Sequence, residues 1–226
     1  ASFSAHFVSM HVKSKRKIGF DQSRSKDFHG LFINESIPTR EEHFVDAYYS
    51  FASILGLQKP PEINWDGLFQ SDGTIEFSDL ELPVTGRIMA VNPLTSKTER
   101  NWNFDSYVKV IDYAHNAGIG VIITGGSGQM ELDLNKRLCE RCKESPLNLT
   151  GKIDLGTLPY LLKRIDFLLA PDTGTIHIAR AVGTPVLGLY AVANPRLTGP
   201  YNANEFSINK FDLALRSHSS ANDRIL

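Results

Sequence analysis

The residues with the clearest potential for chemistry lie in a polar turn, DTGT at 172–175. The apolar segment before it, Phe167–Ala170, has the length of a buried strand, and TIHIARAV at 175–182 has helical spacing. The turn therefore combines a carboxylate, two hydroxyls, a glycine and the free N–H groups of a helix start. Those N–H groups and the helix dipole favour an anion such as a diphosphate. The alternative is that the turn's side chains only cap the helix.

A second apolar segment, PVLGLY at 185–190, completes a strand–helix–strand unit, which indicates a parallel sheet. Two more strand-like segments, RIMAVNP at 87–93 and GIGVIITGG at 118–126, are each followed by a polar loop. Loops that leave the carboxyl ends of neighbouring parallel strands meet at one edge of the sheet. This edge would gather the following candidates: Ser96, Lys97, Thr98, Arg100, Glu131, Asp172, Thr173, Gly174, Thr175 and His177.

Composition narrows the class of protein. The chain has 226 residues, 42% of them hydrophobic and 22% charged, which is ordinary for a soluble globular protein. A net charge of −1 argues against a general nucleic-acid binder, and no apolar run is long enough to span a membrane. Cys139 and Cys142 have no second Cys or His pair at finger-like spacing, so we expect reduced thiols rather than a metal site.

Alternating strands and helices predict an α/β domain over residues 86–226, with helices at 104–117, 130–142 and 155–164. Residues 1–85 are expected to form a first domain and a connection. In it, the pattern predicts a helix from residue 1 to about 13, short strands at 17–20 and 31–34, and a helix at 43–55. Residues 58–86 read as the connection, with an extended piece at 75–82. A basic run from Lys13 to Lys26 is either a solvated face or a site for an anionic partner.

Several motifs together resemble the ADP-heptose:lipopolysaccharide heptosyltransferases, glycosyltransferase family 9. The family pattern D-T-G-x-x-H is matched at 172–177, A-x-x-x-G-T-P from 179, and P-x-x-x-G-P at 195–200. N-P-x-x-S-x-x-x-R-x-W is matched at 92–102, and Glu131 follows the glycine-rich loop as in the family. The resemblance extends over roughly residues 1 to 210.

The resemblance implies a GT-B fold with two Rossmann-like lobes. It implies an inverting transfer of heptose from ADP-heptose to a Kdo or heptose acceptor of the lipopolysaccharide inner core, with no metal or cofactor. The implied partners are the nucleotide-sugar donor and an anionic glycolipid, not nucleic acid. The implied location is the cytoplasm of a Gram-negative bacterium, with peripheral contact to the inner membrane.

Residue roles follow from the matched positions. The turn at 172–174 would hold the donor's sugar and diphosphate, with Thr175 at the helix start facing the phosphates and His177 approaching the same anion. Arg100 would neutralise the charge on the leaving ADP, and Glu131 would accept hydrogen bonds from the nucleoside. The remaining implied roles are donor binding by Ser96 and Thr98 and acceptor binding by Arg24 and Lys26.

The family's general base and its glycine-rich loop lie near the start of the first lobe, and nothing in these 226 residues matches them. The general base is therefore unknown, and we expect most of the first lobe to be missing and this chain to transfer no heptose by itself. Two alternatives remain. One is another GT-B enzyme with a different nucleotide sugar, and the other is a non-catalytic ADP-sugar-binding remnant.

Overall fold

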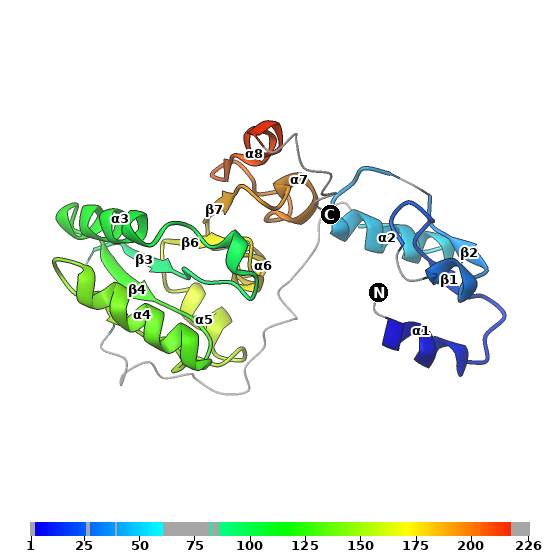
Figure 1. Ribbon diagram of the computed structural model, residues 1–226, viewed down its shortest axis with the longest axis horizontal. Coiled ribbons are helices and arrows are strands. Elements are labelled where there is room, and N and C mark those ends of the chain that lie inside the picture. The colour runs from blue at the N-terminus through cyan, green and yellow to red at the C-terminus, as the bar shows by residue number, and fades with distance from the viewer. Residues whose placement is uncertain (1–2, 26–27, 39, 61–81, 83–85, 218–226) are drawn as a thin grey trace. The chain divides into compact units, whose positions relative to one another are not determined.

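The computed structural model describes residues 3–25, 28–38, 40–60, 82 and 86–217 (Figure 1). The chain divides into two compact units, Ala1–Ile63 and Asn64–Leu226. The predicted connection over residues 58–86 lies mostly outside the described residues and stays a prediction, as does the domain boundary after residue 85.

The second unit is built on a six-stranded sheet in which every neighbouring pair is parallel. Its strands are β3 (Ile88–Val91), β4 (Gly120–Ile123), β5 (Leu147–Asn148), β6 (Phe167–Pro171), β7 (Val186–Tyr190) and β8 (Ile208–Asn209). The spatial order is β5-β4-β3-β6-β7-β8, so the strand order reverses between β3 and β6. This is the Rossmann order, in which ligands bind outside the strand ends at the reversal.

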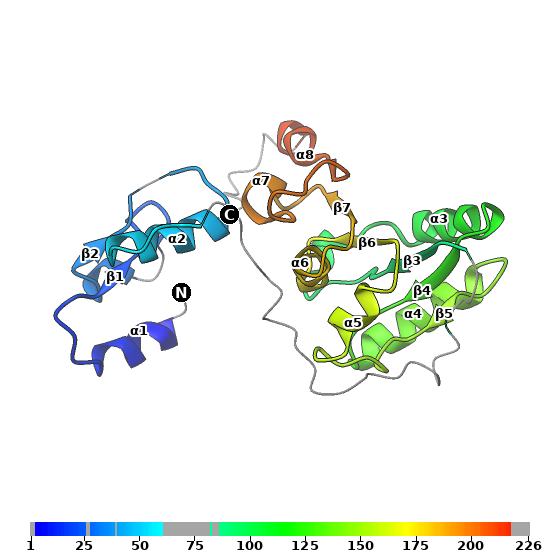
Figure 2. The same cartoon turned by 180° about the vertical axis from the view of Figure 1, so that it is seen from behind.

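Helices cover both faces of this sheet (Figures 1 and 2). On one face lie α3 (Phe104–Asn116) and α4 (Gln129–Arg141), and on the other α5 (Leu158–Leu162) and α6 (Gly174–Ala181). Successive side chains of β3 alternate between the two cores: Met89 and Val91 pack with α3 and α4, whereas Ala90 packs with α5 and α6. Burial on both faces explains why these strands read as continuous apolar runs.

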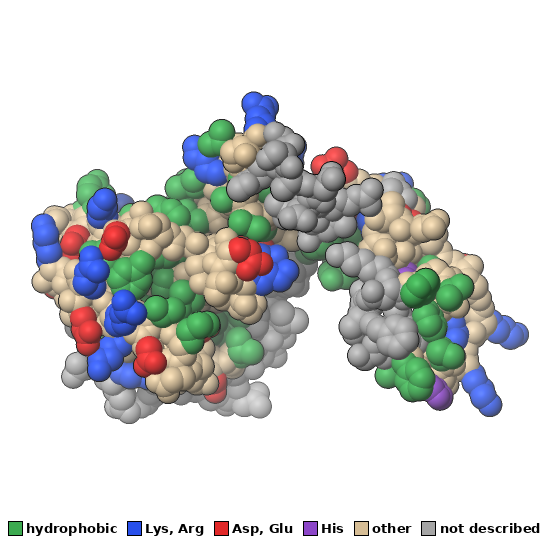
Figure 3. Space-filling model, viewed as in Figure 1, with side chains coloured by type: hydrophobic (Ala, Val, Ile, Leu, Met, Phe, Trp, Pro, Cys, Tyr) green, Lys and Arg blue, Asp and Glu red, His purple; other side chains and the backbone are tan. Residues whose placement is uncertain are grey.

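Shorter elements complete the unit: the 3-10 helix η3 (Thr98–Arg100), α7 (Pro195–Thr198) and α8 (Phe211–Ser217). Charged side chains of both signs are mixed over the face that carries α3 and α4 (Figure 3). No helix in the described part of the chain is long and apolar enough to cross a membrane.

The first unit contains α1 (Phe3–Met10), β1 (Ile18–Gly19), η1 (His29–Leu31), β2 (Glu35–Ser36) and α2 (Phe44–Ile54). The two short strands pair in parallel. The helix predicted at 43–55 is confirmed, and it begins where the His43 ring accepts a hydrogen bond from the Val45 N–H, 3.1 Å away.

The strand predicted at 31–34 is wrong. Leu31 ends a 3-10 turn that starts after Phe28, whose φ of 58° is left-handed, and the strand lies at Glu35–Ser36 instead. The Asn34 side chain fixes this register, because its Oδ1 accepts from the Lys17 N–H at 2.8 Å and its Nδ2 donates to the Lys15 carbonyl at 2.8 Å. Pairing of β2 with β1 thus begins only after Asn34.

Candidate nucleotide-sugar site

The candidate site lies where the sheet order reverses, at the carboxyl ends of β3 and β6. The loop after β3 is held in shape by its own side chains. The Thr95 N–H donates to Asn101 Oδ1 at 2.8 Å, and the Thr95 hydroxyl donates to the Lys97 carbonyl at 2.6 Å. These hydrogen bonds hold the loop in a defined conformation. Its 3-10 turn, η3, ends at Arg100.

Arg100 and Asp172 form the main contact between the two strand ends. Arg100 Nη1 donates to Asp172 Oδ2 at 2.6 Å, although the two residues are 72 positions apart. The Asp172 side chain is 7% exposed and that of Arg100 28%. Arg100 Nε is buried and has no hydrogen-bond partner among the described residues. The guanidinium therefore keeps unused donor capacity, which suits it to a ligand with several acceptor oxygens.

A second bond joins the same two strand ends. The buried Asn92 Nδ2 donates to Thr175 Oγ1 in the first turn of α6, at 3.0 Å. Thr173 is the N-cap of α6, but its side chain accepts no capping hydrogen bond within the described residues. The structure thus does not bear out the reading of this turn as a simple cap, and the first-turn N–H groups of α6 are not occupied by the Thr173 hydroxyl.

The glycine-rich loop after β4 lies against the Glu131 carboxylate. The Glu131 carboxylate accepts a hydrogen bond from the Gly126 N–H. A Cβ atom at Gly125 would lie 2.9 Å from Asn135 Nδ2 and 3.1 Å from Glu131 Oε2. Gly125 is therefore required by close approach of side chains from α4. The carboxylate predicted to bind the nucleoside has this loop as its partner in the present structure.

A polar pocket of about 420 Å³ adjoins these groups. Its walls are the loop at 124–127, the segment at 151–158, and the side chains of Asn92 and Thr175. Thr124 Oγ1 is buried there without a partner among the described residues. The volume lies within the range of small-molecule sites, roughly 300–1,000 Å³.

The predicted residues are thus brought together in part. Arg100, Asp172 and Thr175 converge on the edge between β3 and β6, whereas Ser96, Thr98, Gly174 and His177 are exposed beside it. Sequence reasoning did not select Asn92 and Thr124 as site residues. Each is the first polar residue after an apolar strand, and this position was the signal that could have identified them.

In the first unit, Arg24 is surrounded by acceptors. Its Nε donates to Asp21 Oδ2 at 2.5 Å, its Nη2 donates to the Pro38 carbonyl at 2.6 Å, and its Nη1 lies 3.6 Å from Glu42 Oε1. The Arg24 side chain is 21% exposed. Lys26, the other predicted acceptor residue, lies outside the described residues. The charge of Arg24 is thus balanced within the unit by two carboxylates.

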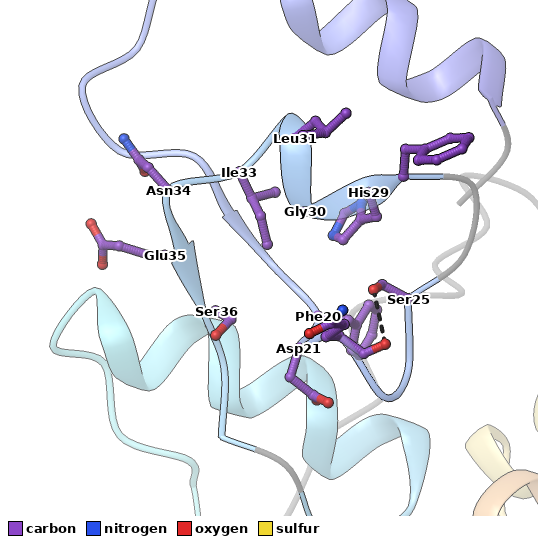
Figure 4. Close-up of a pocket in the computed structure, with 12 residues that line it drawn as sticks. Phe20, Asp21, Ser25, His29, Gly30, Leu31, Ile33, Asn34, Glu35 and Ser36 are labelled. Atoms are coloured by element: carbon purple, nitrogen blue, oxygen red, sulfur yellow. Dashed lines mark hydrogen bonds between the residues drawn. The ribbon is translucent and has the colours of Figure 1, made fainter.

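The charge of Arg16 is also balanced within the unit, by a bidentate ion pair with Glu35. Both N···O distances in this pair are 2.7 Å. Next to this pair lies an open pocket of about 730 Å³, lined by residues of the segments 20–25 and 28–36 (Figure 4). Figure 4 shows side chains that line it, among them His29, Ile33 and Glu35. Over the described residues, no three His, Cys, Asp or Glu side chains gather closely enough to hold a metal ion.

The parallel sheet in Rossmann order, with helices on both faces and a polar pocket beside the reversal, defines a Rossmann-like α/β domain. The chain belongs to glycosyltransferase family 9 (heptosyltransferase), whose family model matches residues 1–221. The resemblance seen in the motifs is therefore confirmed.

Known relatives agree with this family. The chain is 35% identical over 202 residues to the lipopolysaccharide core heptosyltransferase OpsX of Haemophilus influenzae, an alignment that covers 89% of this chain and 58% of that protein. Among solved structures, a family 9 glycosyltransferase of Veillonella parvula matches with a TM-score of 0.71 and 21% identity, over 97% of this chain and 64% of that one. The heptosyltransferase WaaC of E. coli, solved with ADP, matches with a TM-score of 0.64 and 21% identity, over 90% and 63%.

These structural neighbours confirm the predicted α/β fold of GT-B type. The chain spans about three-fifths of the length of these three proteins.

Proposed function

We propose that this chain provides the donor-binding domain and part of the acceptor-side lobe of an inverting heptosyltransferase. The reaction would transfer heptose from ADP-heptose to the lipopolysaccharide inner core. The observation that carries the proposal is the Arg100–Asp172 pair at the reversal of strand order, since it places a cation and a carboxylate side by side where ligands of this fold bind.

In the proposed donor complex, Arg100 and the first turn of α6 hold the diphosphate. A guanidinium and a helix N-terminus both favour phosphate oxygens, and the two lie at adjacent strand ends here. The nucleoside occupies the 420 Å³ pocket, where the Thr124 hydroxyl and the backbone of the glycine-rich loop are available. Asp172 and Thr173 bind the sugar hydroxyls. Ser96, Thr98 and His177, which are exposed beside this edge, also contact the donor. That WaaC was solved with ADP supports the choice of nucleotide.

The leaving group in such a transfer is ADP, which gains negative charge as the glycosidic bond breaks. Arg100 would stabilise this charge, an electrostatic contribution that is strongest in a site shielded from water. Glu131 supports the nucleoside pocket by holding the Gly126 N–H, and it reaches the ribose only if that bond is exchanged. The base that activates the acceptor hydroxyl is not assigned.

The proposed acceptor is an anionic glycolipid of the inner membrane, approached from the cytoplasm by peripheral contact. The basic run of the first unit supports this, although Arg16 and Arg24 are already paired with carboxylates. Exposed Lys13 and Lys15, together with Lys26, are thus the cations proposed to meet the acceptor directly. Binding of a Kdo-bearing glycolipid should weaken as salt is added, because exposed charges are screened.

Calorimetric titration with ADP, ADP-heptose and a UDP-sugar tests the donor assignment. We expect ADP and ADP-heptose to bind and the UDP-sugar to bind at least about tenfold more weakly, a difference of about 1.4 kcal/mol. Equal binding of the UDP-sugar would support a different nucleotide-sugar enzyme. Donor binding without transfer, in a protein extended to the full length of its relatives, would support a non-catalytic remnant.

A further inference from the structure

The Asp172 carboxylate depends on Arg100 for its cation. Within the described residues, Arg100 is the only side chain that donates a hydrogen bond to Asp172, and the N–O distance is 2.6 Å. The Asp172 side chain is almost fully enclosed, at 7% exposure, so little water can replace this donor. Whatever removes Arg100 from Asp172 leaves a buried carboxylate without a counter-charge, which is strongly unfavourable.

A nucleotide diphosphate without a sugar would draw Arg100 away from Asp172 in this way. Its phosphates attract the Arg100 guanidinium, whose Nε has no partner among the described residues and which gains hydrogen bonds from the exchange. Asp172 then loses its cation and also faces an added anion a few ångströms away. Both effects oppose the binding of free ADP at a site that otherwise suits it.

A nucleotide sugar supplies what ADP lacks. Its sugar hydroxyls can donate to Asp172 at the same time as its diphosphate engages Arg100, so both halves of the pair regain a partner. We propose that the Arg100–Asp172 pair makes Asp172 a specificity-determining residue, which selects the complete nucleotide sugar over the free nucleotide diphosphate. This inference rests on the proposed function. It goes beyond sugar binding by Asp172, because it states that Asp172 also weakens the binding of free ADP, the product nucleotide.

The surroundings of Asp172 strengthen this point. The register of β6 with β7 pairs Pro171 with Leu189, so Asp172 follows alongside Tyr190. The Tyr190 hydroxyl is buried and has no hydrogen-bond partner among the described residues. Burial, and secondly the negative charge of Asp172, raise the pKa of this phenol. Among the described residues, the Arg100 guanidinium is the cation that contacts the Asp172 carboxylate.

The pair also has a role after transfer. Once heptose has left, the hydroxyls that satisfied Asp172 are gone, and Asp172 competes with ADP for Arg100. The return of the 2.6 Å pair then favours release of ADP. The Arg100 side chain is 28% exposed, so a ligand can reach part of it from solvent.

The test is a comparison of ADP and ADP-heptose affinities by calorimetry for the parent chain and for Asp172→Asn, which removes the charge with almost no change of shape. The matched control is Asp105→Asn, because Asp105 pairs with Arg141 on the exposed face, 62–63% exposed, and its loss changes the net charge equally. We expect Asp172→Asn to bind ADP about tenfold more tightly than the parent, the order of one partly screened charge–charge interaction. Its preference for ADP-heptose over ADP should largely disappear, while Asp105→Asn behaves as the parent.

Weaker or unchanged ADP binding by a folded Asp172→Asn protein would overturn the inference, since it would mean that Asp172 preorganises Arg100 for the phosphate. That result would leave the proposed function intact if the parent binds ADP. Failure of the parent to bind ADP would overturn both. Thermal unfolding monitors folding, and Asp172→Ser provides the same charge removal if the asparagine variant does not fold.

Discussion

Asn92 and Thr175 are 83 positions apart, yet Asn92 Nδ2 donates a buried hydrogen bond of 3.0 Å to Thr175 Oγ1. The bond joins the carboxyl end of β3 to the first turn of α6, the helix that follows Asp172. It thereby sets the spacing between the two loops of the candidate site, and Thr175 contributes to the site by holding these elements in place.

Thr175→Val should lower the free energy of unfolding by about 1–3 kcal/mol, because it leaves the buried Asn92 amide without its acceptor. Thr175→Ser keeps the hydroxyl and is the matched control. Urea unfolding followed by circular dichroism measures the difference. Equal stability of the valine and serine variants would mean that this bond contributes nothing to the edge.

Two glycines of one loop provide a second test. A Cβ at Gly125 would lie 2.9 Å from Asn135 Nδ2, whereas nothing lies within 4 Å of a Cβ at Gly128. Gly125→Ala should therefore weaken ADP binding and destabilise the fold by about 1–3 kcal/mol, the usual cost of overpacking, while Gly128→Ala should leave both unchanged. If the two alanine variants behave alike in titration and unfolding, the close approach of α4 to this loop is incorrect.

Alkaline pH should destabilise the second unit through its cysteines. Burial, with smaller contributions from neighbouring charges, raises the pKa of Cys139 and of Cys142 from an ordinary 9.0 to about 11. The folded state therefore holds protons that the unfolded state releases, so this stability is complete below pH 9.0 and is lost as the pH rises to about 11.

Unfolding midpoints measured from pH 8 to 11 test this, with a Cys139→Ala and Cys142→Ala double variant as the control that should lose part of the pH dependence. Under native conditions at neutral pH, both thiols should also react slowly with iodoacetamide, since the thiolate is the reactive form. Fast modification at neutral pH would contradict the raised pKa of these thiols.

Arg24→Ala should destabilise the first unit more than Arg16→Ala. Arg24 contacts two carboxylates and the carbonyls of Ile37 and Pro38, and its side chain is 21% exposed. Arg16 contacts one carboxylate and the Ile54 carbonyl, and the side chains of its pair with Glu35 are 48% and 36% exposed. An exposed pair contributes about 0–1 kcal/mol, but removing Arg24 takes away a cation that contacts two sheltered carboxylates. Proteolysis of the first unit reports the difference. Equal susceptibility of the two variants would show that the contacts of Arg24 contribute no more than a surface pair.

Much of the second unit could be predicted from its sequence. Strands such as Phe167–Pro171 are buried on both faces, so they appear as short apolar runs, and each is followed by polar residues at its carboxyl end. Parallel connections then require those ends to share an edge, which is why Arg100 and Asp172 could be assigned to one site. The donation from Arg100 to Asp172 itself was not predictable, because a sequence shows which residues share an edge but not which of them pair.

The first unit was less predictable, for physical reasons. Strand β2 has two residues, too few to show any periodicity, and its register depends on the Asn34 side chain. Within the basic run only Asp21 and Asp27 oppose the cations, whereas Glu35 and Glu42, which pair with Arg16 and Arg24, lie 19 and 18 positions away in sequence. Charge balance of this kind arises from tertiary contacts and has no local signal.

The most direct test of the central claim is calorimetric titration of ADP into the parent chain and into Arg100→Ala, with AMP as the matched ligand. If Arg100 binds the diphosphate, the variant should lose about 1.5–3 kcal/mol of ADP binding, roughly ten- to a hundredfold in affinity, and should lose less for AMP. Arg196→Ala, which removes an exposed arginine paired with Asp212, should bind ADP as the parent does. Unchanged ADP affinity in Arg100→Ala would contradict the account, because it would place Arg100 outside the donor site.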